Sequence, residues 1–230
     1  AQREGFGDLL AEGGYRMAKH YGHPEYSMGV KKQEFASYEC RAIQSMALAY
    51  ATEPRGACHI RGEAQDYAIY SVVHWHITKD RSIEEPLDPL DVESQPEMVA
   101  ELQDWFRLID SGGLCNFMFY LGMDEDQLRD LIESATGIDM GGYPGLMRTG
   151  ARIFNLEVLF NRRAGVTAAA DTLPPRMLKE PLPDGPAKGH VAELDRMLPR
   201  YYRARGWDER GNLTAGKASE LDLADALAKA

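Results

Sequence analysis

The segment Asp110-Ser-Gly-Gly-Leu-Cys115 combines a carboxylate, two adjacent glycines and a thiol. The glycines allow the backbone to turn sharply and to approach a large ligand while its amide groups stay available as donors. The Asp110 carboxylate can accept paired hydrogen bonds from a guanidine-like ring edge such as that of a pterin, and a Cys115 thiolate can ligate iron. Taken alone, the same residues are also typical of a helix that ends at Gly-Gly and precedes a buried structural cysteine.

A second segment, Arg55-Gly-Ala-Cys-His-Ile-Arg61, places two guanidinium groups around the imidazole of His59. Such a composition suits the binding of anionic groups and the transfer of protons, although a polar surface turn would have the same composition. His74 and His76 would point to the same side of an extended chain, but no third or fourth ligand stands nearby. We therefore predict no metal site at these two histidines.

Composition narrows the classes of partner. The chain has 230 residues, 36 acidic against 26 basic, and its net charge of −10 disfavours nucleic acid and anionic membranes as partners. Three widely spaced cysteines argue against a disulfide framework and favour the reducing cytoplasm. The uncharged apolar runs are too short to span a bilayer. We expect small molecules or proteins as partners.

The elements that must position these segments are helical. Gly7 to Gly22 has helical spacing, with Asp8 as the expected N-cap, and residues 23–40 read as turns and extended chain. We place a boundary there between two helical domains, 1–38 and 39–230. Arg41 to Thr52 is apolar on nearly all sides, so we predict a buried helix that leads into Arg55. Residues 62–94 show no sustained periodicity, which predicts a long irregular excursion.

The second half of the chain also has sequence patterns typical of helices. Pro96 begins an amphipathic helix that Gly112 stops, so Asp110 should lie at a helix C-terminus. Asp124 and Gln127 form a capping-box pattern. Five prolines interrupt residues 166–186. Further helices are predicted over Asp124–Gly137, Tyr143–Ala164, His190–Arg205 and Ala218–Lys229. Continuous strand patterns are nearly absent, so an all-α, bundle-like fold is predicted.

Several motifs together resemble the aldehyde:ferredoxin oxidoreductase family in their order and approximate spacing. Besides the two segments above, the resemblance rests on the motifs Arg3-Glu-Gly-Phe-Gly-Asp-Leu-Leu-Ala-Glu-Gly13, Ala47-Leu-Ala-Tyr-Ala-Thr52, Arg152-Ile-Phe-Asn-Leu-Glu157, Asp171-Thr-Leu-Pro-Pro-Arg176, Gly185-Pro-Ala-Lys-Gly189, Tyr201-Tyr202 and Arg205-Gly-Trp-Asp208. It covers nearly the whole chain and corresponds to the end of the second and the third domain of that fold.

The resemblance implies a tungsten (or molybdenum) atom held by two pterins beside a [4Fe–4S] cluster, in an enzyme that oxidises aldehydes to carboxylic acids with ferredoxin as electron acceptor. It implies that Asp110 and Leu114 contact one pterin, that Arg55, Gly56 and Arg61 help to bind it, and that Cys115 is the fourth cluster ligand. His59 would stand close to the metal and move a proton. The missing N-terminal domains would be partners, a homo-oligomer is compatible with the pattern, and the 230 residues alone should be inactive.

The chain also departs from the family pattern. It lacks the CxxCxxxC cluster triplet and the β-rich domain, and its segment between His59 and Asp110 is longer, with Tyr67, Tyr70 and Trp75 as candidates to line a substrate channel. A tungsten subunit of the benzoyl-CoA reductase kind is therefore an alternative function. So is a helical binding module without cofactor. An abrupt start at Ala1 also suits a fragment of a longer polypeptide.

Overall fold

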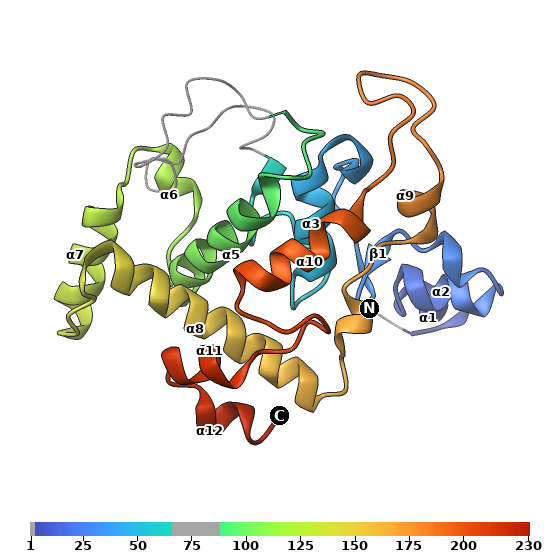
Figure 1. The fold of residues 1–230 in the computed structure, drawn as a ribbon. Coiled ribbons are helices and arrows are strands. Elements are labelled where there is room, and N and C mark those ends of the chain that lie inside the picture. Colours follow the sequence, from blue (N-terminus) through green and yellow to red (C-terminus); the bar gives the residue numbers. More distant parts are fainter. Residues whose placement is uncertain (1–2, 66–87) are drawn as a thin grey trace.

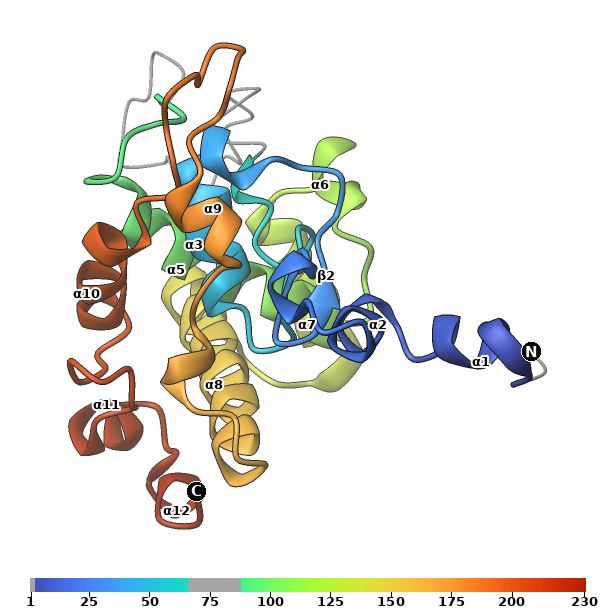
Figure 2. The same ribbon diagram turned by 90° about the vertical axis from the view of Figure 1, so that its right-hand side faces the viewer.

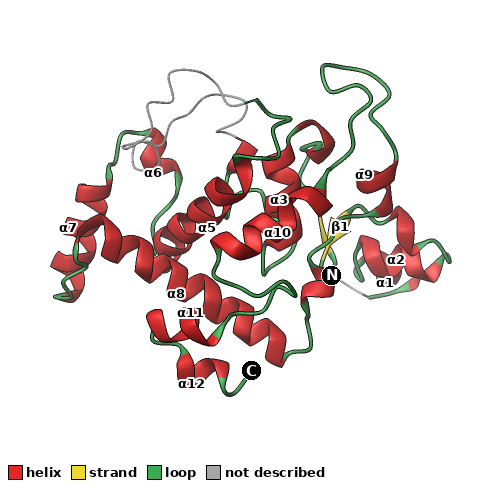
Figure 3. Ribbon diagram, viewed as in Figure 1, coloured by secondary structure: helices red, strands yellow, loops and turns green. Residues whose placement is uncertain are grey.

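A computed structural model describes residues 3–65 and 88–230, and these residues are mainly helical (Figures 1 and 3). All-α is thus the right fold class, as predicted. The histidines His74 and His76, the aromatic residues of the proposed channel and most of the irregular excursion 62–94 lie outside the described residues.

The N-terminal segment forms two short helices where one was predicted. These are α1 (Gly5–Leu10) and α2 (Gly14–His20), and α1 extends away from the rest of the molecule (Figure 2). Gly13 separates them because it adopts φ +82°, a conformation open to glycine but not to a helix interior. Asp8 lies inside the first turn of α1, where it pairs with Arg3 at 2.6 Å, and it is not the N-cap.

A small antiparallel hairpin connects these helices to the core. It follows the 3-10 turn η1 (Pro24–Tyr26) and pairs β1 (Gly29–Val30) with β2 (Gln33–Glu34). Lys31 lies in its turn, and its buried Nζ is 2.9 Å from the Asp171 carboxylate and donates to the carbonyl of Ala51 at 2.7 Å. The hairpin is thereby bonded both to Ala51, in the predicted buried helix, and to Asp171, in the C-terminal half.

The predicted buried helix is confirmed, but it begins later than expected. It is α3 (Gln44–Thr52), and every one of its nine residues is buried. The 3-10 turn η2 (Cys40–Ala42) precedes it. Arg41 stays outside the helix because its guanidinium group pairs with Glu39 at 2.7 Å and donates to the carbonyl of Glu180 at 2.7 Å.

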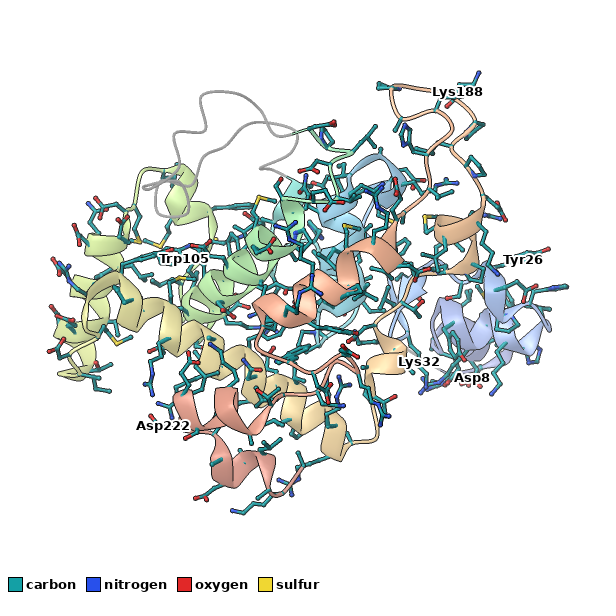
Figure 4. The ribbon with its side chains drawn as sticks, viewed as in Figure 1. Asp8, Tyr26, Lys32, Trp105, Lys188 and Asp222 are labelled. Atoms are coloured by element: carbon teal, nitrogen blue, oxygen red, sulfur yellow. The ribbon has the colours of Figure 1, made fainter. Side chains whose placement is uncertain are left out.

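The core is organised around α5 (Gln95–Ser111), which packs against α3, against α8 (Gly142–Arg163) and against α10 (Leu194–Ala204) (Figures 1 and 2). The contact between α5 and α8 is close because Gly150 faces the Asp104 carbonyl, where a Cβ would come within 2.0 Å of the oxygen. Trp105 is fully buried, and its ring lies 6.5 Å from that of Tyr143 near the start of α8 (Figure 4). The amphipathic helix that the sequence predicted is therefore the central element.

The remaining helices cover this core. The predicted capping box of Asp124 and Gln127 is present, and Gly137 ends that helix in the left-handed conformation. The single helix predicted over Ala218–Lys229 is instead two short helices, separated near Asp222, whose φ is +53°. None of the described helices is both long and apolar enough to cross a bilayer. The covering elements are α6 (Phe117–Tyr120), α7 (Glu125–Thr136), η3 (Ala168–Ala170), α9 (Pro175–Lys179), α11 (Ala215–Glu220) and α12 (Ala224–Leu227).

Candidate functional site

Arg61 joins three elements that are far apart in the sequence. It lies in the loop after α3, and its Nε is 2.9 Å from Oδ2 of Asp110 in the last turn of α5. Its Nη1 donates to Oε1 of Glu157, in the middle of α8, at 3.0 Å. The structure therefore brings two of the predicted site residues, Arg61 and Asp110, into direct contact.

Behind Arg61 lies a second arginine that the sequence did not single out. Arg107 Nε donates to Oε2 of Glu157 at 2.7 Å, its Nη1 donates to the Arg61 carbonyl at 3.2 Å, and its Nη2 pairs with Glu53. The side chains of Arg107 and Glu53 are each 1% exposed. Burial lowers the pKa of Arg107, but the carboxylates of Glu53 and Glu157 outweigh it, so the pKa is raised and the guanidinium stays charged.

We call these five residues, Glu53, Arg61, Arg107, Asp110 and Glu157, the Arg61–Arg107 network. It runs from a fully buried ion pair to a partly exposed one, because the Arg61 side chain is 24% exposed and that of Asp110 is 39% exposed. At the buried end, Oε2 of Glu53 has no hydrogen-bond partner among the described residues. At the exposed end, Asp110 can still accept hydrogen bonds from a ligand because its side chain is 39% exposed.

A hollow of about 500 Å³ opens beside the network. Arg55 and Arg61 contribute its positive charge, and exposed Leu156 and Phe160 on α8 contribute an apolar wall. Guanidinium groups bind anionic groups and stack on flat rings, so this wall suits a flat ligand that also carries negative charge. The full set of lining residues is Pro54, Arg55, Arg61, Leu156, Glu157, Phe160 and Asn161.

The C-terminus of α5 presents the thiol. Gly113 adopts φ +72°, and the Leu114 amide donates back to the Ile109 carbonyl at 3.2 Å, which closes the helix as the two glycines predicted. Leu114 is half-buried, whereas Cys115 is exposed, with its Sγ 4.0 Å from the Asn116 side chain. The interpretation of Cys115 as a buried structural cysteine is therefore wrong.

Two further predicted site residues, Gly56 and His59, lie in the same loop as Arg61 but pack against other elements. Gly56 has φ +114°, and a Cβ there would lie 2.6 Å from the Val30 carbonyl oxygen, so this glycine lets the loop pack against the hairpin. His59 contacts Tyr38, with ring centroids 5.2 Å apart. The loop 55–61 thus borders the hollow through Arg55 and Arg61, while His59 faces the segment before η2.

Sequence reasoning missed Glu53 and Arg107 as members of the site. Arg107 lies between Phe106 and Leu108 in the predicted amphipathic helix, and Glu53 directly follows the predicted buried helix. A charged residue at a buried position requires a partner of opposite charge. That was the signal available. Glu157 was noticed only within a motif, with no role attached.

The residues present fit part of a pterin and cluster site. Asp110 is a partly exposed acceptor, Arg55 and Arg61 are donors, and Cys115 is an accessible thiol at the same helix end as Asp110. Within residues 3–65 and 88–230, no group of three or more His, Cys, Asp or Glu side chains could hold a metal ion. Among the described residues, Cys115 is therefore a candidate for one cluster ligand, and these residues hold no whole ligand set.

The comparisons with known proteins identify the family of the chain. Residues 1–223 match the family model described as aldehyde ferredoxin oxidoreductase, domains 2 & 3. The chain is 45% identical over 227 residues to the tungsten-containing aldehyde ferredoxin oxidoreductase of Pyrococcus furiosus, covering 98% of this chain and 35% of that protein. It is 44% identical over 225 residues to the enzyme of Pyrococcus abyssi, covering 97% of this chain and 35% of that protein.

A solved structure has the same fold. It is the active-site complex BamBC of benzoyl coenzyme A reductase with 1,5-dienoyl-CoA, with a TM-score of 0.73 at 19% identity, over 99% of this chain and 38% of that one. The chain thus spans about a third of the length of the curated relatives that it matches. This chain belongs to the aldehyde ferredoxin oxidoreductase family, of which it represents the C-terminal portion.

Proposed function

We propose that this chain supplies one side of the cofactor site of a tungsten-pterin, iron–sulfur enzyme that oxidises aldehydes to carboxylic acids and passes the electrons to ferredoxin. The observation that carries the proposal is the ion pair of Arg61 and Asp110 at 2.9 Å, at the same helix end as the exposed thiol of Cys115. It occurs in a chain 45% identical to a tungsten-containing aldehyde ferredoxin oxidoreductase.

Asp110 and Leu114 would contact one pterin, and Arg55, Gly56 and Arg61 would help to bind it. In this assignment the ion pair with Arg61 orients the Asp110 carboxylate, which leaves its other oxygen for the amino-pyrimidine edge of a pterin. Glu157 and Arg107 hold Arg61 from behind, so its guanidinium is preorganised before the ligand binds.

Cys115 would ligate the cluster, because its thiol is exposed whereas those of Cys40 and Cys58 are buried. The remaining ligands would come from residues outside this chain. His59 would hold or move a proton at its imidazole during oxygen transfer between water and the aldehyde. When bound, the tungsten-pterin group supplies the two-electron chemistry and the cluster carries single electrons to ferredoxin.

The test uses the full-length protein, purified without oxygen. We expect tungsten and roughly four irons per chain, as one cubane cluster requires. Cys115→Ser should lower the iron content while circular dichroism remains that of the parent. Cys40→Ala, which removes a fully buried cysteine, is the control and should keep its iron. A parent without tungsten or molybdenum, or a Cys115→Ser variant with unchanged iron, would refute the assignment.

His59 is tested separately. His59→Ala should lower turnover with an aldehyde by roughly 100- to 10,000-fold if the imidazole moves a proton, with a smaller change in tungsten content. His190→Ala replaces an exposed histidine and is the matched control. Equal turnover in the two variants would remove His59 from the proposed mechanism and would leave the cofactor assignment standing.

A further inference from the structure

A buried acidic side chain lies next to the segment that carries the exposed thiol. It is Glu63, which is 3% exposed and belongs to a run of buried residues, 62–65. This run packs between two core helices, because a Cβ on Gly62 would lie 3.3 Å from the Gln103 side chain on α5 and 4.0 Å from that of Ala49 on α3. The packing of α3 against α5 therefore fixes the backbone that carries Glu63.

The backbone of Glu63 is strained. Its φ is +34°, in the left-handed region that a residue with a Cβ rarely adopts. Such a conformation is unfavourable and persists only where the surrounding structure requires it, and strained residues of this kind gather at functional sites. The tertiary structure therefore directs the Glu63 side chain against the local preference of its backbone.

The Glu63 carboxylate accepts a hydrogen bond from the side chain of Asn116, the residue that follows Cys115. The donor is Nδ2 of Asn116 and the acceptor is Oε1 of Glu63. An ionised carboxylate accepts hydrogen bonds and cannot donate them, so the nitrogen side of the amide faces Glu63. On the other side of the amide, Oδ1 of Asn116 accepts from the Cys115 thiol, whose Sγ is 4.0 Å away. One buried carboxylate thus sets which end of the amide meets the sulfur.

The orientation of this amide has a consequence for a sulfur that ligates iron. Hydrogen bonds to the sulfurs and the charge nearby both set the reduction potential of an iron–sulfur cluster. A donor stabilises the reduced, more negative form, whereas an amide oxygen and a carboxylate stabilise the oxidised form. Because Glu63 holds its nitrogen, Asn116 presents an oxygen rather than a donor to Sγ of Cys115. The carboxylate and the amide therefore act in the same direction, towards a low potential.

We propose that Glu63 and Asn116 are positioning residues that lower the reduction potential of the cluster at Cys115, by turning the amide oxygen of Asn116 towards the ligating sulfur. This inference rests on the proposed function, because it takes Cys115 as a cluster ligand. It assigns to the pair a role in electron transfer, since a cluster of lower potential is a stronger electron donor once it is reduced.

The experiment measures the midpoint potential of the cluster in the full-length protein, purified without oxygen, by a redox titration followed with electron paramagnetic resonance. Glu63→Gln keeps the size of the side chain and removes its charge, and its amide donates as well as accepts, so Asn116 becomes free to turn. At a fixed solution potential the ratio of reduced to oxidised cluster should rise roughly tenfold, a shift of about 59 mV for a one-electron couple. Iron content and circular dichroism should remain those of the parent.

Three further variants separate this role from a purely structural one. Asp195→Asn removes one charge at an exposed position on α10 and should leave the potential unchanged. Asn116→Leu removes the amide at nearly the same size and should raise the potential, which keeps the comparison possible if Glu63→Gln loses iron. The double variant of Glu63→Gln with Asn116→Asp reverses the pair, because the new carboxylate accepts from the new amide and turns a negative oxygen towards the sulfur. Its potential should return to that of the parent or fall below it, which a disturbed fold would not produce.

The possible outcomes distinguish this inference from the proposed function. A parent that contains the cluster, with the same potential in Glu63→Gln, Asn116→Leu and Asp195→Asn, would overturn the inference alone. So would a potential that stays raised in the double variant. A full-length parent without iron would overturn both. A parent that contains the cluster and oxidises no aldehyde, with potentials that follow the expected pattern, would refute the proposed substrate and support the role of Glu63 and Asn116.

Discussion

Two arginine-centred clusters contact the ring of Phe154, and they differ in how far they extend towards the surface. The guanidinium of Arg107 lies 5.2 Å from the Phe154 ring centroid, and that of Arg205 lies 3.7 Å from it. Arg107 belongs to the Arg61–Arg107 network, which ends at partly exposed Arg61 and Asp110. Arg205 belongs to a second group, with Gln103, Asp104 and Tyr201, which we call the Arg205 cluster.

The Arg205 cluster is closed. Arg205 Nε donates to the Tyr201 hydroxyl at 3.0 Å, its Nη2 donates to Oε1 of Gln103 at 2.9 Å, and its Nη1 pairs with Asp104. Arg205 and Gln103 are 3% and 0% exposed. Burial raises the pKa of Tyr201 to about 12, so its hydroxyl remains a neutral donor and acceptor.

The difference shows how one helix serves both stability and binding. Gln103, Asp104, Arg107 and Asp110 all belong to α5, yet the first two are satisfied internally whereas Asp110 keeps capacity for a ligand. A buried polar cluster whose members all have partners makes the packing specific, and a chain of ion pairs that ends at the surface preorganises a site. The contrast leads to four predictions.

The largest effect is expected at the buried end of the open network. Arg107→Met should lower the free energy of unfolding by about 4 kcal/mol, because the buried Glu53 carboxylate loses its close partner and keeps only Arg61, whose Nη1 is 3.9 Å away, as a counter-charge. The double variant with Glu53→Gln should recover a large part of this loss. Urea denaturation of the chain measures both, and a loss below about 1 kcal/mol would show that this end is hydrated rather than buried.

A somewhat smaller loss is expected in the closed cluster. Arg205→Met should cost about 3 kcal/mol, near the lower end of the range for a broken buried pair, because the Asp104 side chain is 15% exposed and can regain some water. Arg203→Met, at an exposed position in the last turn of α10, is the control and should change little. The tungsten content of folded full-length Arg205→Met should equal that of the parent. A loss of tungsten in this variant would show that the Arg205 cluster also supports the cofactor site.

Arg61→Ala should show the opposite behaviour. Its ion pairs are partly exposed, so the free energy of unfolding should fall by less than about 1 kcal/mol, while tungsten content of the full-length protein should drop clearly. Arg163→Ala, at an exposed position on α8, should keep both properties. If Arg61→Ala instead destabilised the fold as much as Arg107→Met, the open end would be structural.

The smallest effect on the protein is expected from chemical labelling of its thiols, which compares exposed Cys115 with buried Cys40. Burial raises the pKa of Cys40 to about 12, so its reactive thiolate is scarce at neutral pH and alkylation by iodoacetamide should accelerate only as the pH rises towards that value. Exposed Cys115 should react first at pH 8, and Cys115→Ser should remove that fast phase. In cofactor-loaded full-length protein the fast phase should be absent, since a cluster ligand is protected.

Local features were predictable from the sequence because their partners lie within one helical turn. The capping box of Asp124 and Gln127 and the helix stop at Gly112 depend only on neighbouring backbone groups. The N-terminal prediction was wrong in detail because the left-handed conformation of Gly13, which divides the helix, is one that glycine permits but does not require. Arg41 was assigned to a helix because its tertiary partner, the Glu180 carbonyl, is 139 residues away.

The sequence by itself determined that the chain is helical, that Asp110 ends a glycine-stopped helix, and which family its motifs match. The domain boundary between residues 38 and 39 stays a prediction. Only the tertiary structure decided that Arg61 lies against Asp110, that Glu157 from 96 residues further along holds it, and that the charge of Arg107 is buried against Glu53. The physical reason is that helix propensity and capping act over a few residues, whereas these ion pairs exist only where α3, α5 and α8 pack together.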